Sequence, residues 1–244
     1  FVERMNKRAQ ELGMSDTHYD NCVGFDSDTH YTSAYDTALL SAAVSEYDCY
    51  NDFFNTRLDY VREGERQTQL LNTNKLMQRY DGIIGGKTGT TDNAGCCLAV
   101  WAKRGNMKLC AVALGCKESE QRFTACENLL DYGFSGYELY RISVKDDVLQ
   151  PLPVTEGLSK DVDVRVKRLS TIVIPKGSSK RIEYTHTVTE SLSAPVQYGE
   201  KVGEMRASLD GEEIFYSDIV TTKEVGELNF FSSLCIIISS FFRM

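Results

Sequence analysis

The sequence predicts an α+β fold, in which helices pack on an antiparallel sheet, followed by a small all-β domain. Two apolar runs that flank a tight turn and lead into a helix support the first part. Short strands with a period of two residues support the second part. The 244 residues, 42% of them hydrophobic and 25% charged, have the composition of a globular protein with a sizeable core.

The clearest sheet signal is a hairpin. Residues 95–103 have the pattern of an apolar strand, residues 104–106 that of a tight turn, and residues 108–115 that of the returning strand. Ser119 is expected to cap a helix that ends at Gly133, with apolar residues at helical spacing between them. Two antiparallel strands followed by such a helix predict one layer of sheet and one layer of helix.

Two earlier helices are predicted from the same kind of spacing. The first opens the chain and ends at Gly13, and the second is capped by Thr32. Their defining apolar positions are Val2, Met5, Ala9 and Leu12 in the first helix, and Tyr35, Ala38, Leu39 and Ala42 in the second. Because Phe1 is not an initiator methionine and begins within a helical pattern, we expect the chain to be a fragment.

From about Ser143 the pattern changes to short strands. Three valines, Val162, Val164 and Val166, alternate with charged residues, as in a half-buried strand. The dipeptide Asp210-Gly211 is a strong signal for a two-residue hairpin turn. This part is therefore expected to be a small all-β domain without catalytic residues.

The chain ends in an uncharged run, residues 228–242. As a helix these residues extend over about 22 Å, which is short of the roughly 30 Å hydrocarbon core of a membrane. One asparagine and three serines fall on one side of that helix, which favours an amphipathic helix lying in one leaflet over a buried core helix. We expect three segments: a helix-and-sheet domain (1–142), a β-rich domain (143–225) and a membrane-anchor segment (226–244).

Composition and spacing argue against several classes of function. A net charge of −8 without a basic cluster argues against nucleic acid as a partner. His18, His30 and His186 are too scattered for a metal site, and the aspartates before His30 lack the glycine and glutamate of a calcium loop. No metal or other cofactor is expected. The eight cysteines do not resemble a disulfide framework, and we expect small buried hydrophobic side chains.

Residues 81–91, Asp-Gly-Ile-Ile-Gly-Gly-Lys-Thr-Gly-Thr-Thr, carry the clearest chemical signal. They do not fit a phosphate-binding P-loop, because an aspartate holds the first glycine position and the later glycines would break the helix that such a loop opens. A strand fits better: Lys87 supplies a cation, Thr88 and Thr90 supply hydroxyl groups, and Gly89 leaves room for a second backbone. A peptide would pair along this strand with its terminal carboxylate near the cation. The triplet Lys-Thr-Gly alone also fits a surface lysine beside a turn.

The surroundings of this triplet resemble the serine D-Ala-D-Ala carboxypeptidases, which are low-molecular-mass penicillin-binding proteins. The matching positions, in order and spacing, are Phe1, Val2, Met5, Asn6, Ala9, residues 12–14, Thr17, Asn21, Gly24, residues 30–32, Asp36, residues 72–76, 86–89 and 94–95, Arg122 and residues 130–134. The resemblance covers residues 1 to about 140 and implies a β-lactamase/penicillin-binding-protein-like domain. The β-rich part and the apolar tail follow the family plan of a stalk and a C-terminal amphipathic anchor.

That family uses three motifs, Ser-x-x-Lys, Ser-x-Asn and Lys-Thr-Gly. The 244 residues contain only the last, so the nucleophilic serine is expected outside this chain. By resemblance, Lys87 stabilises the active-site network, and the backbone N–H of Thr90 forms half of an oxyanion hole. Thr88, Gly89 and Arg122 are assigned to substrate binding, with a solvated helix-face arginine as the alternative for Arg122.

The resemblance implies a serine-type D-Ala-D-Ala carboxypeptidase, a hydrolase that trims the terminal D-Ala of peptidoglycan stem peptides through an acyl-enzyme. This chain alone is expected to be inactive. The implied partners are peptidoglycan pentapeptide stems, β-lactams and, through the C-terminal segment, the outer face of the bacterial cytoplasmic membrane. The alternatives are a related transpeptidase or β-lactamase, and a catalytically inactive cell-wall-binding module. The β-rich domain and the tail favour the carboxypeptidase over a β-lactamase.

Overall fold

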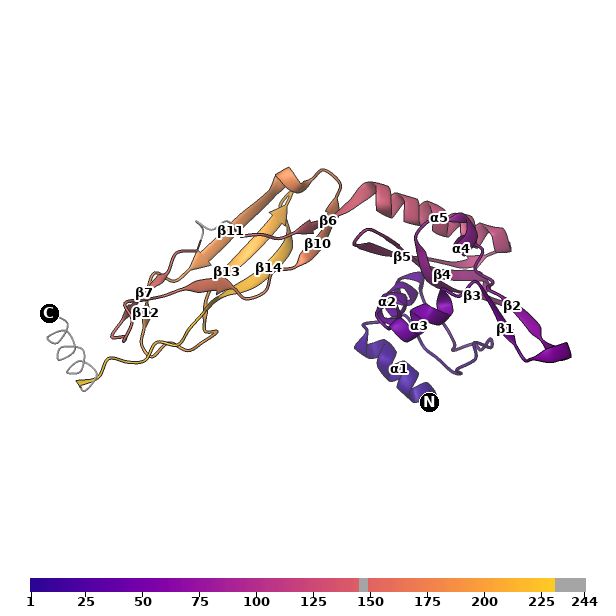
Figure 1. Cartoon of the computed structure of the whole chain (residues 1–244), viewed down its shortest axis with the longest axis horizontal. Helices are drawn as coiled ribbons and strands as arrows, with labels where there is room; N and C mark the ends of the chain where they lie inside the picture. The colour runs from indigo at the N-terminus through magenta and orange to yellow at the C-terminus, as the bar shows by residue number, and fades with distance from the viewer. Residues whose placement is uncertain (145–148, 231–244) are drawn as a thin grey trace. The chain divides into compact units, whose positions relative to one another are not determined.

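The computed structural model describes residues 1–144 and 149–230. The chain divides into two compact units, Phe1–Tyr137 and Glu138–Met244, and each is described by itself. The first unit is built of helices and an antiparallel sheet, and the second of short strands (Figure 1). The predicted α+β class followed by a β-rich part is therefore confirmed.

The sheet of the first unit positions the candidate site. It consists of β3 (Ile83–Thr91), β4 (Gly95–Arg104) and β5 (Met107–Cys116), antiparallel and in that order, so that β3 forms one edge. The predicted hairpin is confirmed: Arg104 pairs with Met107, and Gly105 in the turn has a φ of +58°, which glycine adopts without strain.

One face of this sheet is covered by α5 (Ser119–Gly136), which packs on β4 and β5 (Figure 1). The buried residues between them are Leu98, Val100, Ala102, Ala111, Ala113, Phe123, Cys126 and Leu130, with Leu76 beside them. The predicted cap and end of this helix are wrong. Glu118 is the N-cap and forms a capping box with Gln121, and the helix continues through Gly133 to Gly136.

The other face of the sheet is covered by α2 (Ala34–Val44) and α3 (Asp48–Phe54) (Figure 1). The ring of Phe54 meets Trp101 of β4 edge to face, with 5.5 Å between centroids. The prediction that Thr32 caps α2 is wrong, because the Ser33 side chain accepts the hydrogen bond from the backbone N–H of Asp36.

The predicted apolar face of α2 is also wrong in part, because Tyr35 and Ala42 are exposed whereas Asp36 and Ser41 are buried. The Asp36 carboxylate is turned inward, where it accepts hydrogen bonds from the backbone N–H of Asp16 and the hydroxyl of Thr17, both at 2.7 Å.

The remaining elements of the first unit are short. The chain opens with α1 (Val2–Glu11), whose C-cap is Leu12 rather than the predicted Gly13. Gly13 follows the cap with a φ of +76°, as is common just after a helix. An exposed hairpin follows α3, and a single-turn helix precedes β3. These elements are β1 (Leu58–Val61), a 3₁₀ turn (Gly64–Arg66), β2 (Thr68–Leu71) and α4 (Leu76–Arg79).

The described residues of the β-rich part form three small sheets, with strand orders β11-β13-β14-β9, β12-β7-β8 and β10-β6. Its strands are β6 (Tyr137–Arg141), β7 (Leu152–Thr155), β8 (Asp161–Val162), β9 (Val164–Val166), β10 (Thr171–Pro175), β11 (Ile182–Val188), β12 (Leu192–Ser193), β13 (Lys201–Leu209) and β14 (Glu212–Thr221), with a 3₁₀ turn at Ser179–Arg181. The hairpin predicted at Asp210-Gly211 joins β13 to β14, and both residues have positive φ, as a two-residue turn requires.

The membrane-anchor helix predicted for residues 228–242 lies for the most part outside the described residues, which end at residue 230. Among the helices that are described, none is long and apolar enough to cross a membrane. The expectation of buried cysteines is wrong for two of the seven that are described. Cys22 and Cys49 are exposed, Cys126 is buried, and the other four are half-buried.

Candidate active site

Four of the five predicted site residues, Lys87 to Thr90, follow one another on β3. The strand pairs with β4 on one side, where Lys87 lies opposite Ala99 and Thr90 opposite Cys96. Within the part of the chain that the structure describes, no strand pairs with its other side. The backbone groups of this outer edge are therefore available to an extended peptide.

Because side chains alternate along a strand, the predicted residues are divided between the two faces of the sheet. Thr88 and Thr90 are on the face covered by α5, since Thr88 pairs with the buried residue Leu98. Lys87 and Gly89 are on the other face. Because β3 is an edge strand, a ligand that pairs with it would lie near the side chains on both faces.

The glycines of β3 have different roles. A Cβ at Gly85 would lie 2.5 Å from the indole ring of Trp101, and a Cβ at Gly86 would lie 2.8 Å from the Asn74 amide nitrogen. These two glycines are needed for packing. A Cβ at Gly89 would meet only Cys97, at 4.0 Å, so the missing side chain leaves open space beside the strand.

Arg122 joins α5 to the end of β3. Its Nη1 donates to the carbonyl oxygen of Gly89 at 3.0 Å, to the hydroxyl of Thr90 at 3.1 Å and to the carbonyl oxygen of Cys97 at 3.3 Å. Its Nη2 donates to the hydroxyl of Ser119 at 3.0 Å. The side chain is 8% exposed, so the alternative of a solvated helix-face arginine is wrong. A buried positive charge is thus fixed beside Gly89 and Thr90.

Lys87 presents a second positive charge at the same strand. The side chain is exposed, and its ammonium donates to the carbonyl oxygen of Thr88. Among the described residues no carboxylate lies within ion-pair distance of it, so its charge is not neutralised by a protein partner there. With Arg122 on the other face, two positive charges flank residues 87–90 of β3, and both can attract an anionic group.

Thr73 is a site residue to which the sequence analysis gave no role. Its hydroxyl oxygen lies 2.6 Å from that of Thr88, at hydrogen-bond distance, and Thr73 is exposed whereas Thr88 is 9% exposed. The next residue, Asn74, is buried and accepts from the backbone N–H of Leu76 at 3.1 Å. The block Asn72–Leu76 resembles the family in sequence, but a hydrogen bond across fifteen positions leaves no periodic signal.

The loop before α2 also reaches β3. Asp26 accepts a hydrogen bond from the hydroxyl of Thr91 at 2.6 Å, which ties the loop to the last residue of the strand. In the same loop Asp20 lies 3.2 Å from the His18 ring, and its backbone N–H donates to His30 at 3.1 Å. No group of three His, Cys, Asp or Glu residues among those described is arranged to hold a metal ion.

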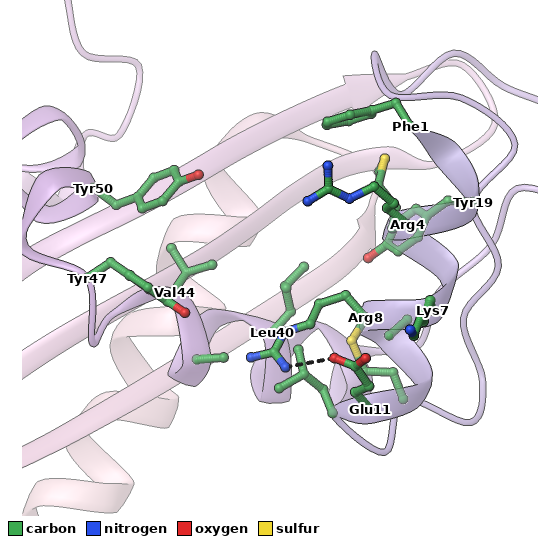
Figure 2. Close-up of a pocket in the computed structure, with 15 residues that line it drawn as sticks. Phe1, Arg4, Lys7, Arg8, Glu11, Tyr19, Leu40, Val44, Tyr47 and Tyr50 are labelled. Atoms are coloured by element: carbon green, nitrogen blue, oxygen red, sulfur yellow. Dashed lines mark hydrogen bonds and ion pairs between the residues drawn. The ribbon is translucent and has the colours of Figure 1, made fainter.

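A separate cavity lies elsewhere in the first unit. It has a volume of about 760 Å³ and is bounded by α1, α2 and the start of α3, with Leu40, Val44 and Tyr50 among its walls (Figure 2). The ion pair between Arg8 and Glu11, at 3.1 Å, lies along its wall (Figure 2). None of the five predicted site residues lines it. The predicted site residues therefore lie at β3 and beside it, outside this cavity.

Comparison with known proteins identifies the family. Residues 1–118 match the family model of the D-alanyl-D-alanine carboxypeptidases, and residues 137–227 match the C-terminal domain of penicillin-binding protein 5. The chain is 31% identical to D-alanyl-D-alanine carboxypeptidase DacF of Bacillus subtilis, over 96% of this chain and 61% of that protein. It is 31% identical to DacA of Escherichia coli, over 96% of this chain and 58% of that protein.

A structural comparison gives the same result. The crystal structure of penicillin-binding protein 5 from Haemophilus influenzae superposes with a TM-score of 0.76 at 26% identity, covering 93% of this chain and 66% of that one. The chain spans about three fifths of the length of the curated relatives it matches. It belongs to the D-alanyl-D-alanine carboxypeptidase family of penicillin-binding proteins.

Proposed function

We propose that this chain supplies the carboxylate-binding strand of a serine-type D-Ala-D-Ala carboxypeptidase, which removes the terminal D-Ala from peptidoglycan stem peptides. The observation that carries the proposal is the edge strand β3, with the exposed ammonium of Lys87 on one face and the buried guanidinium of Arg122 against the other. A stem peptide is an extended chain that ends in a carboxylate, and both features complement this edge.

Each residue of the strand has a proposed role. The peptide pairs with the open edge of β3, in the space left by Gly89. The hydroxyl of Thr88 and the ammonium of Lys87 bind the terminal carboxylate. The backbone N–H of Thr90 donates to the oxyanion that forms when the scissile carbonyl is attacked. Arg122 acts through its charge and by holding Gly89 and Thr90, because its Nη1 and Nη2 are already bonded to protein acceptors.

The serine that forms the acyl-enzyme is proposed to lie upstream of Phe1, because no Ser-x-x-Lys occurs in the 244 residues. The test is labelling with a fluorescent penicillin, followed by intact-mass spectrometry. The 244-residue chain should remain unlabelled, whereas the protein expressed with its upstream coding sequence should gain one adduct. An adduct on the 244-residue chain would refute the upstream serine, and an unlabelled longer protein would refute the proposed function.

The same longer protein distinguishes the related activities. With a D-Ala-D-Ala peptide we expect release of free D-Ala and a shortened peptide, which is hydrolysis. A peptide joined to an added amine acceptor would instead indicate a transpeptidase, and rapid release of hydrolysed penicillin a β-lactamase. Binding to isolated cell walls with none of these reactions would indicate an inactive cell-wall-binding module.

We further propose that the chain is organised as residues 1–142, 143–225 and 226–244, and that the last segment attaches the protein to the outer face of the cytoplasmic membrane. The uncharged run 228–242 with its polar stripe supports this proposal. Deleting everything after Glu227 should convert a vesicle-bound protein into one that stays in the supernatant on co-sedimentation. Continued sedimentation with vesicles would place the anchor elsewhere.

A further inference from the structure

Cys96 of β4 and Cys116 of β5 are register partners at the end of the hairpin next to Thr90. The pairing depends on a bulge: between the pairs Leu98–Ala113 and Cys96–Cys116, β4 has one residue and β5 has two. Gly115 takes up the extra residue with a φ of +70°, a conformation that favours glycine. Without this bulge, the partner of Cys96 would be Gly115.

Both thiols are on the face of the sheet that α5 covers. Cys116 packs against the buried cluster that contains Leu98 and Ala113. Cys96 is two residues from Leu98 and shares its face, and its sulfur lies 4.0 Å from the hydroxyl oxygen of Thr90. That hydroxyl in turn accepts from Arg122 of α5 at 3.1 Å.

We propose that Cys96 and Cys116 are a redox modification site, at which a small disulfide compound or a disulfide-exchange protein generates a cross-strand disulfide. Directly paired residues in antiparallel strands have Cα atoms about 4.5–5.5 Å apart, within the span of about 4.4–6.8 Å that disulfides bridge. Both side chains are half-buried, so a small oxidant reaches them while the strands hold them together.

The neighbouring cysteines are poorer partners. Cys97 is adjacent to Cys96 but points to the opposite face, where its thiol donates to the carbonyl oxygen of Ala94 at 3.3 Å. Burial raises the pKa of the Cys110 thiol, and it raises that of Cys126 to about 12. Cys110 also pairs with Trp101, whose side chain is on the opposite face of the sheet from Leu98. Cys126 supplies little of the thiolate that disulfide exchange requires at neutral pH.

Glutathione disulfide is the oxidant proposed for this thiol–disulfide exchange. The thiolate of one cysteine attacks a sulfur of glutathione disulfide, and one glutathione leaves as its thiol. The second cysteine then attacks the mixed disulfide, the Cys96–Cys116 bond forms, and the second glutathione leaves. The protein loses two electrons and two protons, which the two glutathione molecules gain. The product fixes β4 to β5 beside Thr90, the residue with the proposed oxyanion-binding N–H.

The experiment uses the 244-residue chain and does not depend on the proposed function. The reduced chain is incubated with glutathione disulfide, free thiols are alkylated, and the protein is digested with trypsin. Trypsin releases residues 88–103, which hold Cys96 and Cys97, and residues 109–117, which hold Cys110 and Cys116. Each peptide therefore contains one cysteine of the proposed pair and one control cysteine.

We expect a cross-linked product of these two peptides that disappears on reduction. It should persist in Cys97→Ser and Cys110→Ser, and it should be lost in Cys96→Ser and Cys116→Ser. Alanine versions of the same four variants, with reduced-state melting temperatures, control for folding. A cross-link that survives removal of Cys96 or Cys116, that requires Cys97 or Cys110, or that never forms in the parent chain would overturn the proposal.

Discussion

Nη1 of Arg122 donates a hydrogen bond to the carbonyl oxygen of Gly89 at 3.0 Å, and this contact fixes the end of β3 against α5. Gly89 is the residue whose missing side chain leaves space for a ligand, and Arg122 is 8% exposed. The helix therefore sets the position of the strand at the point where a substrate backbone is proposed to lie.

Replacing Arg122 by lysine should destabilise the chain. A lysine ammonium keeps the charge, but it lacks the planar fork that reaches Gly89, Cys97 and Ser119 at once. Leaving one or two of these groups without a donor should cost about 2 kcal/mol in the free energy of unfolding, measured in urea. The matched change Arg4→Lys, at an exposed arginine of the same unit, should cost less than about 0.5 kcal/mol. Equal stability of the two variants would contradict this role.

Two glycines of β3 should respond oppositely to alanine. Gly85→Ala places a Cβ 2.5 Å from the buried ring of Trp101, and we expect a loss of about 2 kcal/mol in unfolding free energy. Gly89→Ala meets only Cys97 at 4.0 Å, so stability should be kept. In the longer protein, however, Gly89→Ala should slow acylation by penicillin, because the methyl group fills the space proposed for the ligand. Unchanged acylation would show that this space is not used.

The hydrogen bond between Thr73 and Thr88 should affect substrate affinity. A carboxylate only accepts hydrogen bonds, so Thr88 can donate to it only if Thr73 donates to the oxygen of Thr88. In the longer protein, Thr73→Val should raise KM for a D-Ala-D-Ala peptide roughly tenfold, about the value of one hydrogen bond, with a smaller change in kcat. Thr73→Ser, which keeps the hydroxyl, should restore the parent KM. A serine variant as impaired as the valine variant would argue against hydrogen bonding.

The β-rich part should lose stability in acid through Glu204. Hydrogen bonds from Lys201 at 2.8 Å, Arg206 at 2.9 Å and Tyr216 at 3.0 Å lower the pKa of Glu204 from 4.5 to about 2. Because the folded-state pKa is the lower one, this contribution is present above pH 4.5 and is lost as the pH falls towards about 2.

The comparison for Glu204 is with glutamine. Glu204→Gln should flatten the dependence of the urea midpoint on pH in this window, and added salt should reduce the difference, since these groups are at the surface. If the glutamine variant retains the full acid dependence, other carboxylates must carry it.

The sequence predicted those parts of the fold that depend on local signals. The hairpin from Gly95 to Cys116 follows from two apolar runs and a turn with a glycine of positive φ. The predicted helix caps were one residue away from Ser33 and Glu118, because Thr32 is about as good a cap as Ser33 and Ser119 is a better cap by residue type than Glu118. Tertiary contacts decide between such neighbours: Ser119 is used by Arg122.

The candidate site was predictable only in its residue types. The run Lys87 to Thr90 and its resemblance to the family motif predicted a strand. The structure places the Arg122 side chain against that strand. The Thr73–Thr88 hydrogen bond and the Cys96–Cys116 pairing depend on loop geometry and on a bulge at Gly115. Neither follows from periodicity: the first requires the path of the loop beside β3, and the second requires the register of β4 and β5 to one residue.

The most direct test of the account is the rate at which penicillin acylates the longer protein carrying Lys87→Ala. If the ammonium of Lys87 stabilises the transition state at β3, the rate should fall about a hundredfold, or on the order of 3 kcal/mol. Lys87→Arg should recover only part of the rate, because the fork does not reproduce a compact ammonium. Lys103→Ala, at an exposed lysine of β4, should leave the rate unchanged. A folded Lys87→Ala protein that is acylated at the parent rate would contradict the assignment of β3 as the active-site strand.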